Sequence, residues 1–234
     1  MTQLNKRRQK KRALGKILEE PHKELVLKYF LEHIRAQRKY EKYQHGTKFI
    51  RNFQTSLYKG EKNNFLVSLT KSFLDNPVAV SLSTNIEKRQ TPIFSANIRF
   101  TKDKVIVETL QGTPWLKEMR EFERIVKIPS SRYLIHEIIG QAKKMGFDKV
   151  LLIDPTKHGS YRSPYIQSIF DEETKALHTK VAFKTATITE KKRYIEKRKE
   201  FLRIHQERMR KLYENVAKGE GFVKEGKYFV KTLK

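Results

Sequence analysis

Apolar residues recur at helical spacing in three segments of the N-terminal third of the chain. The first segment, residues 23–43, follows Pro21, and the second follows Gly46. The third ends near Asn76-Pro77. Side chains three or four residues apart share one face of a helix, so the pattern predicts a helical segment over residues 17–76. The apolar sets are Val26/Phe30/Ile34, Ile50/Phe53/Leu57 and Phe65/Leu69/Phe73.

After residue 77 the apolar period changes to two. Apolar residues alternate over 78–84, 92–100 and 105–109, as in half-buried strands. Asp103 lies in the short connection Thr101–Lys104, which suits a hairpin turn. We therefore predict an antiparallel pair over residues 92–112, with 78–84 as its neighbour.

The middle of the chain predicts two helices and then a strand. Residues 115–126 form the first helix, and Pro129-Ser130-Ser131 signals the start of a second over 131–145. Gly146 marks the end of that helix. The continuous apolar run within 148–154 is typical of a strand that is buried on both faces and often parallel to its neighbour.

The last third predicts a helix over 164–175, a strand over 180–188, a long helix from Thr189 to about Lys218 and a hairpin turning at Glu225-Gly226. On the long helix an apolar residue recurs every seven positions, which makes a narrow seam on a basic rod. Residues 195–216 therefore offer a surface for a helical partner or a homodimer. The seam residues are Ile195, Leu202, Met209 and Val216.

Together these elements predict an α+β fold, with N-terminal helices, a mixed sheet flanked by helices, and a long basic C-terminal helix with a terminal hairpin. We divide the chain into four parts. They are a basic disordered arm (1–16), a helical segment (17–76), a mixed α+β core (77–188) and the long basic helix with its hairpin (189–234).

Charge adds a prediction about partners. The 234 residues include 51 Lys and Arg against 26 Asp and Glu, a net charge of +25. The excess is largest at the two ends, and the first sixteen residues contain no acid. Such segments bind phosphates, so we expect nucleic acid as the first partner and an anionic membrane surface as the second. A solubility tail is the plainer alternative. The cations assigned to this role are Lys6, Arg7, Arg8, Lys10, Lys11, Arg12, Lys192, Arg193, Lys197 and Arg198.

Candidate ligand-binding residues gather where predicted strands end and helices start. Gln111 and Gly112 close a strand, and glycine lets a ligand approach the backbone closely. Asp154 and His158 follow the buried strand, where a carboxylate can orient an imidazole as a general base. The alternatives are an edge-strand turn for the first pair and an Asp-Pro turn with an exposed histidine for the second. The remaining candidates are Ser130, Ser131 and Arg132 at a helix start, and Tyr161 and Arg162 in the loop.

The composition excludes several classes of chemistry. The chain has no cysteine, which removes disulfides, cysteine nucleophiles and thiolate metal sites. No two of its seven histidines stand at helical ligand spacing, so we expect no metal. No apolar run is long enough for a transmembrane helix and no apolar signal-peptide region follows the basic start, so we expect a cytoplasmic protein.

The element order over residues 45–188 resembles the GNAT acetyltransferase fold, with 131–154 as its central helix and following strand. That resemblance implies an acyl- or group-transferase. Acetyl-CoA enzymes of this type carry a glycine-rich motif before the central helix, whose backbone N–H groups hold a pyrophosphate. Here residues 126–133 contain no glycine and Pro129 removes a donor, so we expect no cofactor.

A more local resemblance covers residues 64–215. A strand ending in Leu110-Gln111-Gly112, then a helix, a buried strand and a loop with His158, resembles the VirK-type family of bacterial proteins. That resemblance implies a role in envelope stress and no particular reaction. We therefore expect a polyanion-binding protein on a degenerate GNAT-like core. The alternatives are a divergent transferase of the GNAT type, a VirK-like protein at an anionic membrane surface, and an accessory component of a ribonucleoprotein.

Overall fold

We analysed a computed structural model of the chain. It describes residues 24–32, 44–61, 63–71, 78–86, 89–112, 116–157, 161 and 180–233. The chain forms two compact units, which we describe separately. Unit 1 comprises residues 1–153 and 216–234, and unit 2 comprises residues 154–215. The basic arm over residues 1–16 and the helix expected over 164–175 lie outside the described residues.

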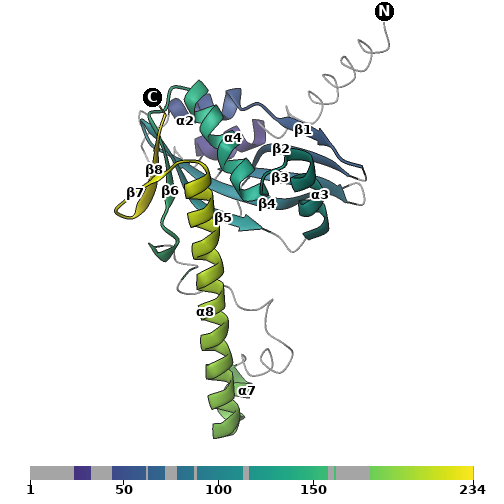
Figure 1. The fold of residues 1–234 in the computed structure, drawn as a ribbon, viewed down its shortest axis with the longest axis vertical. Coiled ribbons are helices and arrows are strands. Elements are labelled where there is room, and N and C mark those ends of the chain that lie inside the picture. Colours follow the sequence, from purple (N-terminus) through teal and green to yellow (C-terminus); the bar gives the residue numbers. More distant parts are fainter. Residues whose placement is uncertain are drawn as a thin grey trace, which may run out of the picture. The chain divides into compact units, whose positions relative to one another are not determined.

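Unit 1 is a mixed α/β structure built on one eight-stranded sheet, in the order β1-β2-β3-β4-β5-β6-β8-β7 (Figure 1). All neighbours are antiparallel except β5 and β6, which are parallel. The strands are β1 (Ser56–Lys59), β2 (Asn64–Lys71), β3 (Val78–Ile86), β4 (Arg89–Phe100), β5 (Lys104–Gly112), β6 (Lys149–Ile153), β7 (Val223–Glu225) and β8 (Tyr228–Thr232).

The sequence predicts the centre of this sheet correctly. β3, β4 and β5 form the expected antiparallel meander, and the backbone N–H of Thr101 donates to the Lys104 carbonyl at 2.9 Å in the expected turn. β6 pairs in parallel with β5 from Lys149 to Leu152. Its consecutive residues Val150, Leu151 and Leu152 are all buried, and because neighbouring residues of a strand point to opposite faces, both faces are covered as expected.

Helices α3 (Leu116–Val126) and α4 (Ser130–Lys144) connect β5 to β6, and α4 contacts β3, β4, β5 and β6 (Figure 1). Leu134, Ile135 and Ile138 on α4 are fully buried. The helix ends as expected at Gly146, whose φ of 80° suits the left-handed position of a C-cap. The N–H groups of Gly146 and Phe147 donate to the carbonyls of Lys143 and Ala142, so the last turn is satisfied.

Two aromatic clusters fix the helices to the sheet. Phe100 of β4 contacts Phe30 in helical residues 24–32, Phe49 in α2 (Gln44–Asn52) and Phe147 after α4. Phe122 of α3 forms the second cluster with Tyr58, Phe65 and Tyr133, at centroid distances of 5.2–5.5 Å. Buried aromatic pairs of this geometry add about 0.5–1.5 kcal/mol each beyond the area that they bury.

The helical segment predicted over residues 17–76 is wrong in its second half. Only 24–32 and α2 are helical among the described residues there, and Ser56–Lys59 and Asn64–Lys71 are strands. Phe65 and Leu69 are four residues apart, a spacing that fits one face of a helix and equally one face of a strand. Val67 lies between them and is also fully buried, and this decides for a strand.

The strand predicted over 180–188 is also wrong. Residues Lys180–Thr185 form helix α7, and α8 covers Ile188–Gly219 in 32 residues. The α8 start is a capping box rather than a cap at Thr189. The Thr187 hydroxyl accepts from the Glu190 N–H at 3.3 Å, and Glu190 accepts from the Thr187 N–H at 2.7 Å. The Thr187 hydroxyl also donates to Glu190 Oε2 at 2.8 Å, and this hydrogen bond, together with the one from the Thr187 N–H, lowers the pKa of the Glu190 carboxyl.

The terminal hairpin is part of the sheet, so the predicted division at residue 189 does not separate it from the core. β7 and β8 pair with each other as expected, but β8 also pairs with β6 along its whole length, from Lys149↔Thr232 to Ile153↔Tyr228. Val230 packs with Ile106 of β5 and Leu151 of β6 in one hydrophobic cluster. Unit 2 is therefore an insertion between two neighbouring strands of unit 1.

This arrangement predicts opposite results for one substitution at two paired positions. Val223 and Val230 face each other across the hairpin, but Val223 is 64% exposed and Val230 only 7%. We expect Val230→Asp to lower the free energy of unfolding by about 3 kcal/mol or more, since it buries a charge. Val223→Asp is the matched control and should stay within about 0.5 kcal/mol. Chemical denaturation measures both. If both variants kept the stability of the wild type, the hairpin would not contribute to the core of unit 1.

Candidate anion-binding site

The parallel strands β5 and β6 separate near the middle of β5. Their ladder ends at the pair Val107↔Leu152, and β5 continues to Gly112 while β6 ends at Ile153. The register between β4 and β5 also shifts here, because Asn97 pairs with Thr109 and Ile98 with Val107. Glu108 is therefore the extra residue of a β-bulge, a feature that redirects a strand and is common beside binding sites. We call this region the β5–β6 fork.

Gln111 and Gly112 end the free part of β5 and are both exposed. They pair with Ser95 and Phe94 of β4 on the side away from β6. A Cβ atom on Gly112 would lie 3.2 Å from the Phe94 ring, so glycine serves close packing of the strand end as well as backbone access. The fork thus places this predicted pair at the carboxyl end of the parallel strands, where ligands bind in open sheets.

The predicted anion site at the start of α4 is occupied by the chain itself. Ser130 and Ser131 are buried, and the Ser130 backbone N–H donates to Glu123 Oε1 at 2.8 Å. The free N–H groups and the positive end of the dipole at a helix N-terminus favour a negative charge, and here Glu123 of α3 supplies it. The Ser130 N–H is thus already bonded within the chain, and a role of Ser130 and Ser131 in binding an external anion stays a prediction.

Arg132 is likewise engaged within unit 1. Its Nε donates to Glu220 Oε1 at 2.7 Å, and the other oxygen of Glu220 lies 3.1 Å from His136 Nδ1. The Glu220 side chain is 8% exposed, whereas those of Arg132 and His136 are 40% and 65% exposed. A buried carboxylate between two partners joins α4 to the residue after α8. Arg132 consequently serves packing in this structure rather than an open ligand site.

Removal of the internal anion tests this reading of the α4 start. We expect Glu123→Ala to lower the free energy of unfolding by about 1 kcal/mol, as loss of a helix cap does. Millimolar phosphate should then restore part of the stability of the variant, because it can reach the vacated N–H groups. Thermal unfolding with and without phosphate gives the measurement. An equal gain in the wild-type protein would show that Glu123 does not fill the site.

Asp154 is buried and accepts two hydrogen bonds from Thr156, from its N–H at 2.9 Å and from its hydroxyl at 2.8 Å. This is the turn that the sequence allows as the alternative to catalysis. His158 and Arg162 lie outside the described residues, so the pairing of Asp154 with His158 stays a prediction. The Tyr161 carbonyl accepts from Gln206 Nε2 at 3.1 Å within unit 2.

A hydroxyl cluster that the sequence analysis missed lies near the start of α4. The Tyr133 hydroxyl donates to Glu137 Oε1 at 2.7 Å and also hydrogen-bonds with the Tyr58 hydroxyl of β1. Burial raises the pKa of Tyr133 well above its usual value, and the hydrogen bonds to Tyr58 and Glu137 raise it further. Tyr133 and Glu137 stand at i, i+4 on a helix, so their contact was readable from sequence, but Tyr58 is 75 residues away from Tyr133.

The Tyr133 shift predicts a loss of stability at alkaline pH. Below about pH 10 the hydroxyl is neutral in both the folded and unfolded states, and its contribution is fully present. Above that pH the unfolded state releases the proton more easily than the folded state, so the contribution falls. Denaturation between pH 8 and 11 should therefore show the stability advantage of the wild type over Tyr133→Phe shrinking. A constant difference would contradict this assignment.

The cations predicted on the long helix lie on α8 but do not form one surface. Lys192, Arg193 and Arg198 are exposed, and Lys197 is partly exposed. At about 100° per residue the four directions spread over about 240° around the helix axis. A different set shares one face, at positions i, i+7, i+11 and i+18, within about 40°. We call Lys192, Lys199, Arg203 and Arg210 the α8 stripe; all four are exposed.

The apolar seam predicted on α8 has two different ends. Ile195 is 43% exposed, whereas Val216 is buried and belongs to unit 1. Leu202 and Met209 between them are partly exposed. The apolar seam is thus exposed at Ile195 and buried at Val216. Binding of a helical partner, or of a second copy of the chain, through residues 195–216 stays a prediction.

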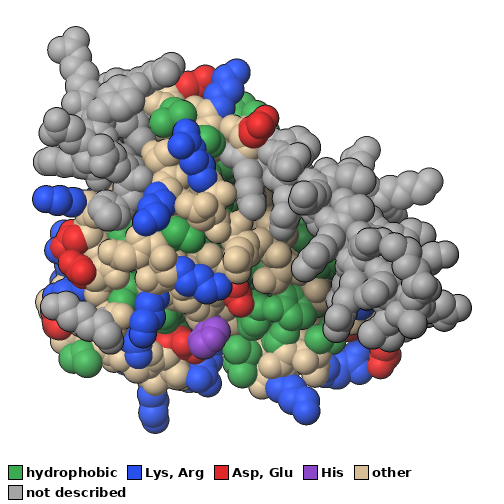
Figure 2. All heavy atoms as spheres, turned by 90° about the horizontal axis from the view of Figure 1, so that it is seen from above, with side chains coloured by type: hydrophobic (Ala, Val, Ile, Leu, Met, Phe, Trp, Pro, Cys, Tyr) green, Lys and Arg blue, Asp and Glu red, His purple; other side chains and the backbone are tan. Residues whose placement is uncertain are grey.

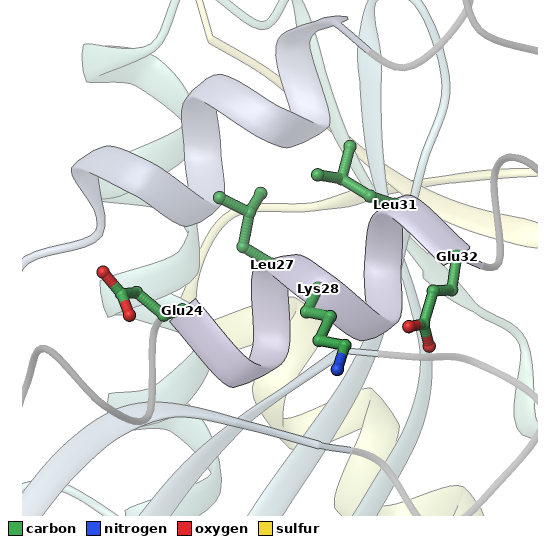
Figure 3. A pocket seen from close by; sticks show the side chains of 5 residues that line it. All are labelled: Glu24, Leu27, Lys28, Leu31 and Glu32. Carbon is green, nitrogen blue, oxygen red and sulfur yellow. The ribbon is translucent and has the colours of Figure 1, made fainter.

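The surface and its hollows show where charge gathers. On the face drawn in Figure 2, Lys and Arg side chains are spread among other surface types. A hollow of about 310 Å³ follows helical residues 24–32, and in Figure 3 Leu27 and Leu31 point to one side of the view and Lys28 and Glu32 to the other. Glu24 also lines the hollow. The described lining contains two glutamates and one lysine, so its charge does not favour binding of an anion. A larger hollow, of about 670 Å³, lies on α3.

Metal and membrane features were also sought in the described ranges. Within them no three His, Asp or Glu side chains gather as a metal would require. None of the helices that the structure describes is both long and apolar enough to cross a bilayer.

Comparisons with known proteins gave no relative. No family model matches the chain, and no curated protein or solved structure is significantly similar to it. The function must therefore be argued from the residues themselves.

Proposed function

We propose that this protein binds a polyanion, and that the polyanion is nucleic acid. The observation that carries the proposal is the α8 stripe. α8 contains eleven Lys and Arg against five Glu, over a length of about 48 Å. A row of cations on one side of a straight helix can follow a phosphate backbone, and each neutralised phosphate releases counterions.

Ion pairing uses only part of this charge. Arg203 pairs with Glu200 at 2.7 Å and with Glu207 at 3.7 Å. Within the described ranges, Lys192, Lys199 and Arg210 of the stripe form no ion pair. Their charge is available to a partner. The sequence adds a second group of cations in residues 1–16, which contain no acid.

Exposed apolar area on α8 favours nucleic acid over a membrane. A helix that lies in a membrane interface presents a continuous apolar face to the lipid. The exposed large hydrophobic residues of α8, among those described, are Ile188 and Ile195. Two isoleucines at one end of a 32-residue helix are a small anchor, so an anionic membrane surface is the second candidate. A nucleic acid partner also accords with the cytoplasmic location expected from the sequence.

The α8 stripe predicts a specific change in salt dependence. Fluorescence anisotropy with a labelled single-stranded RNA should show an affinity that falls steeply with salt. Replacing Lys192, Lys199, Arg203 and Arg210 by Gln should reduce the log–log slope by about 2, since three of these cations form no ion pair and each phosphate contact on a single strand contributes about 0.7. The matched control replaces Arg198, Arg208, Lys211 and Lys218, which point in other directions, and should lose less. If both variants lost the same slope, binding would depend on the total charge of α8 and not on the α8 stripe. If the wild type did not bind RNA at low salt, the proposal would be refuted.

A divergent transferase on a GNAT-like core is the second function that we propose. It is supported by the β5–β6 fork, because a parallel pair that opens beside a bulge offers backbone groups to a ligand. The order of meander, helix, parallel strand and terminal strands agrees with the GNAT resemblance. Leu110-Gln111-Gly112 at the end of β5 similarly supports a relationship to the VirK-type family.

The transferase proposal predicts ligand stabilisation. Acetyl-CoA at a hundred times its dissociation constant should add about 2.7 kcal/mol to the free energy of unfolding. Gly112→Val should reduce this gain, because it places a branched side chain at the fork. Thermal shift assays of wild type and variant provide the measurement. No shift with acetyl-CoA, CoA or a nucleotide would leave polyanion binding as the function.

A further inference from the structure

The packing of α3 fixes which of its faces meets solvent. Phe122 is fully buried in the aromatic cluster with Tyr58, Phe65 and Tyr133. One residue before it, Glu121 is also buried, and its carboxylate accepts from Asn63 Nδ2 at 3.0 Å. These contacts hold one side of the helix against the rest of unit 1. They fix the rotation of α3 about its own axis, and so determine which side chains of the helix face solvent.

That opposite side is cationic. Lys117, Arg120 and Arg124 stand at i, i+3 and i+7, are all exposed, and line the hollow of about 670 Å³ together with Glu123. In the part of the chain that the structure describes, none of these three cations forms an ion pair or a hydrogen bond. We call them the α3 triad.

Helix stability does not explain the α3 triad. Like charges at i, i+3 and i, i+4 destabilise a helix by about 0.2–0.5 kcal/mol per pair, and the triad contains one pair of each kind. Glu118, Glu121 and Glu123 each stand beside one triad residue in the sequence. Glu123 is the one of these acids that lines the hollow, and its carboxylate already accepts from the Ser130 N–H at 2.8 Å. Among the described residues, the lining therefore has a net charge of +2, and its negative group, Glu123, is held in place by the start of α4.

The spacing of the α3 triad suits a linear ligand. Lys117 and Arg124 are seven residues apart, which corresponds to about 10 Å along the helix axis. A strand of duplex DNA carries one phosphate per about 3.4 Å of axis, so four successive phosphates, with three intervals between them, span about 10 Å. Guanidinium groups bind phosphate oxygens in a bidentate manner, and two of the three cations are arginines. A small phosphate compound would be better held by cations that converge on one point.

We propose that the α3 triad binds successive phosphates of a single nucleic acid strand. This inference rests on the proposed function and assigns it a second contact surface, in unit 1. The surface is separate in sequence from the cations of residues 1–16 and of α8. No residue of the triad belongs to the α4 start, the fork or the hydroxyl cluster.

The test uses the full chain and a fluorescein-labelled oligouridylate, titrated by anisotropy at several salt concentrations. The variant Lys117→Gln/Arg120→Gln/Arg124→Gln should lower the log–log salt slope by about 2, since three contacts at about 0.7 each are lost. Lys48→Gln/Arg51→Gln/Lys143→Gln is the control, because it removes the same charge from exposed positions on α2 and α4. The control should keep the wild-type slope to within about 0.5.

Charge-conserving variants keep the test informative if the triple variant unfolds. Arg120→Lys/Arg124→Lys retains both charges but loses the planar fork, so it should keep the salt slope and weaken binding several-fold. Circular dichroism establishes that each variant is folded. A slope that is unchanged in the triple variant while the wild type binds would overturn the α3 assignment alone. Absence of binding by the wild type at low salt would overturn the proposed function as well.

Two further outcomes would identify a different ligand. If the triple variant loses binding to phosphatidylserine vesicles but keeps its affinity for oligouridylate, the triad takes a lipid headgroup and the assignment is wrong. If inorganic phosphate stabilises the wild type but not the triple variant, while RNA affinity is equal in both, the hollow takes a small phosphate compound. Loss of RNA affinity with loss of the slope supports the assignment.

Discussion

The fold of unit 1 depends on pairing both edges of β6. This five-residue strand lies about two thirds of the way along the chain, is buried on both faces and has a parallel partner, β5, on one side. The amide and carbonyl groups on its other side need partners too, because unpaired backbone groups are costly in a protein interior. β8 supplies them. The burial of Phe229 and Val230 in β8 follows from this requirement.

Local signals in the sequence predicted the parts of the fold that local interactions decide. The β4–β5 turn, the two helices α3 and α4, the glycine at the end of α4 and the terminal hairpin need only neighbouring residues. The failures have physical causes of two kinds. Phe65 and Leu69 fit either period, so only the burial of Val67 separated strand from helix. The place of β8 beside β6 is a contact between distant segments, and no short pattern announces it.

The predictions of site residues also succeeded where local patterns decide and failed where distant segments meet. Gln111 and Gly112 lie at the end of a strand as expected, because strand ends follow from the period of the pattern. Ser130, Ser131 and Arg132 were assigned to an external anion, but the Ser130 N–H donates to Glu123 and Arg132 donates to Glu220 of the same chain. A sequence shows that a helix start attracts negative charge, and it does not show which carboxylate arrives. The α3 triad was missed because its i, i+3, i+7 spacing also describes an ordinary solvated face.

The insertion of unit 2 between neighbouring strands has a consequence for synthesis of the chain. Ile153 and Tyr228 are register partners, but 75 residues separate them in sequence. At a translation rate of about 5–20 residues per second, β6 waits roughly 4–15 s for its second partner after it has been made. During that interval the emerging chain has a hydrophobic strand with one open edge, which is a template for pairing with other chains. Unit 2 would emerge during this interval, so binding of a partner there could act on the nascent chain before the sheet of unit 1 is complete.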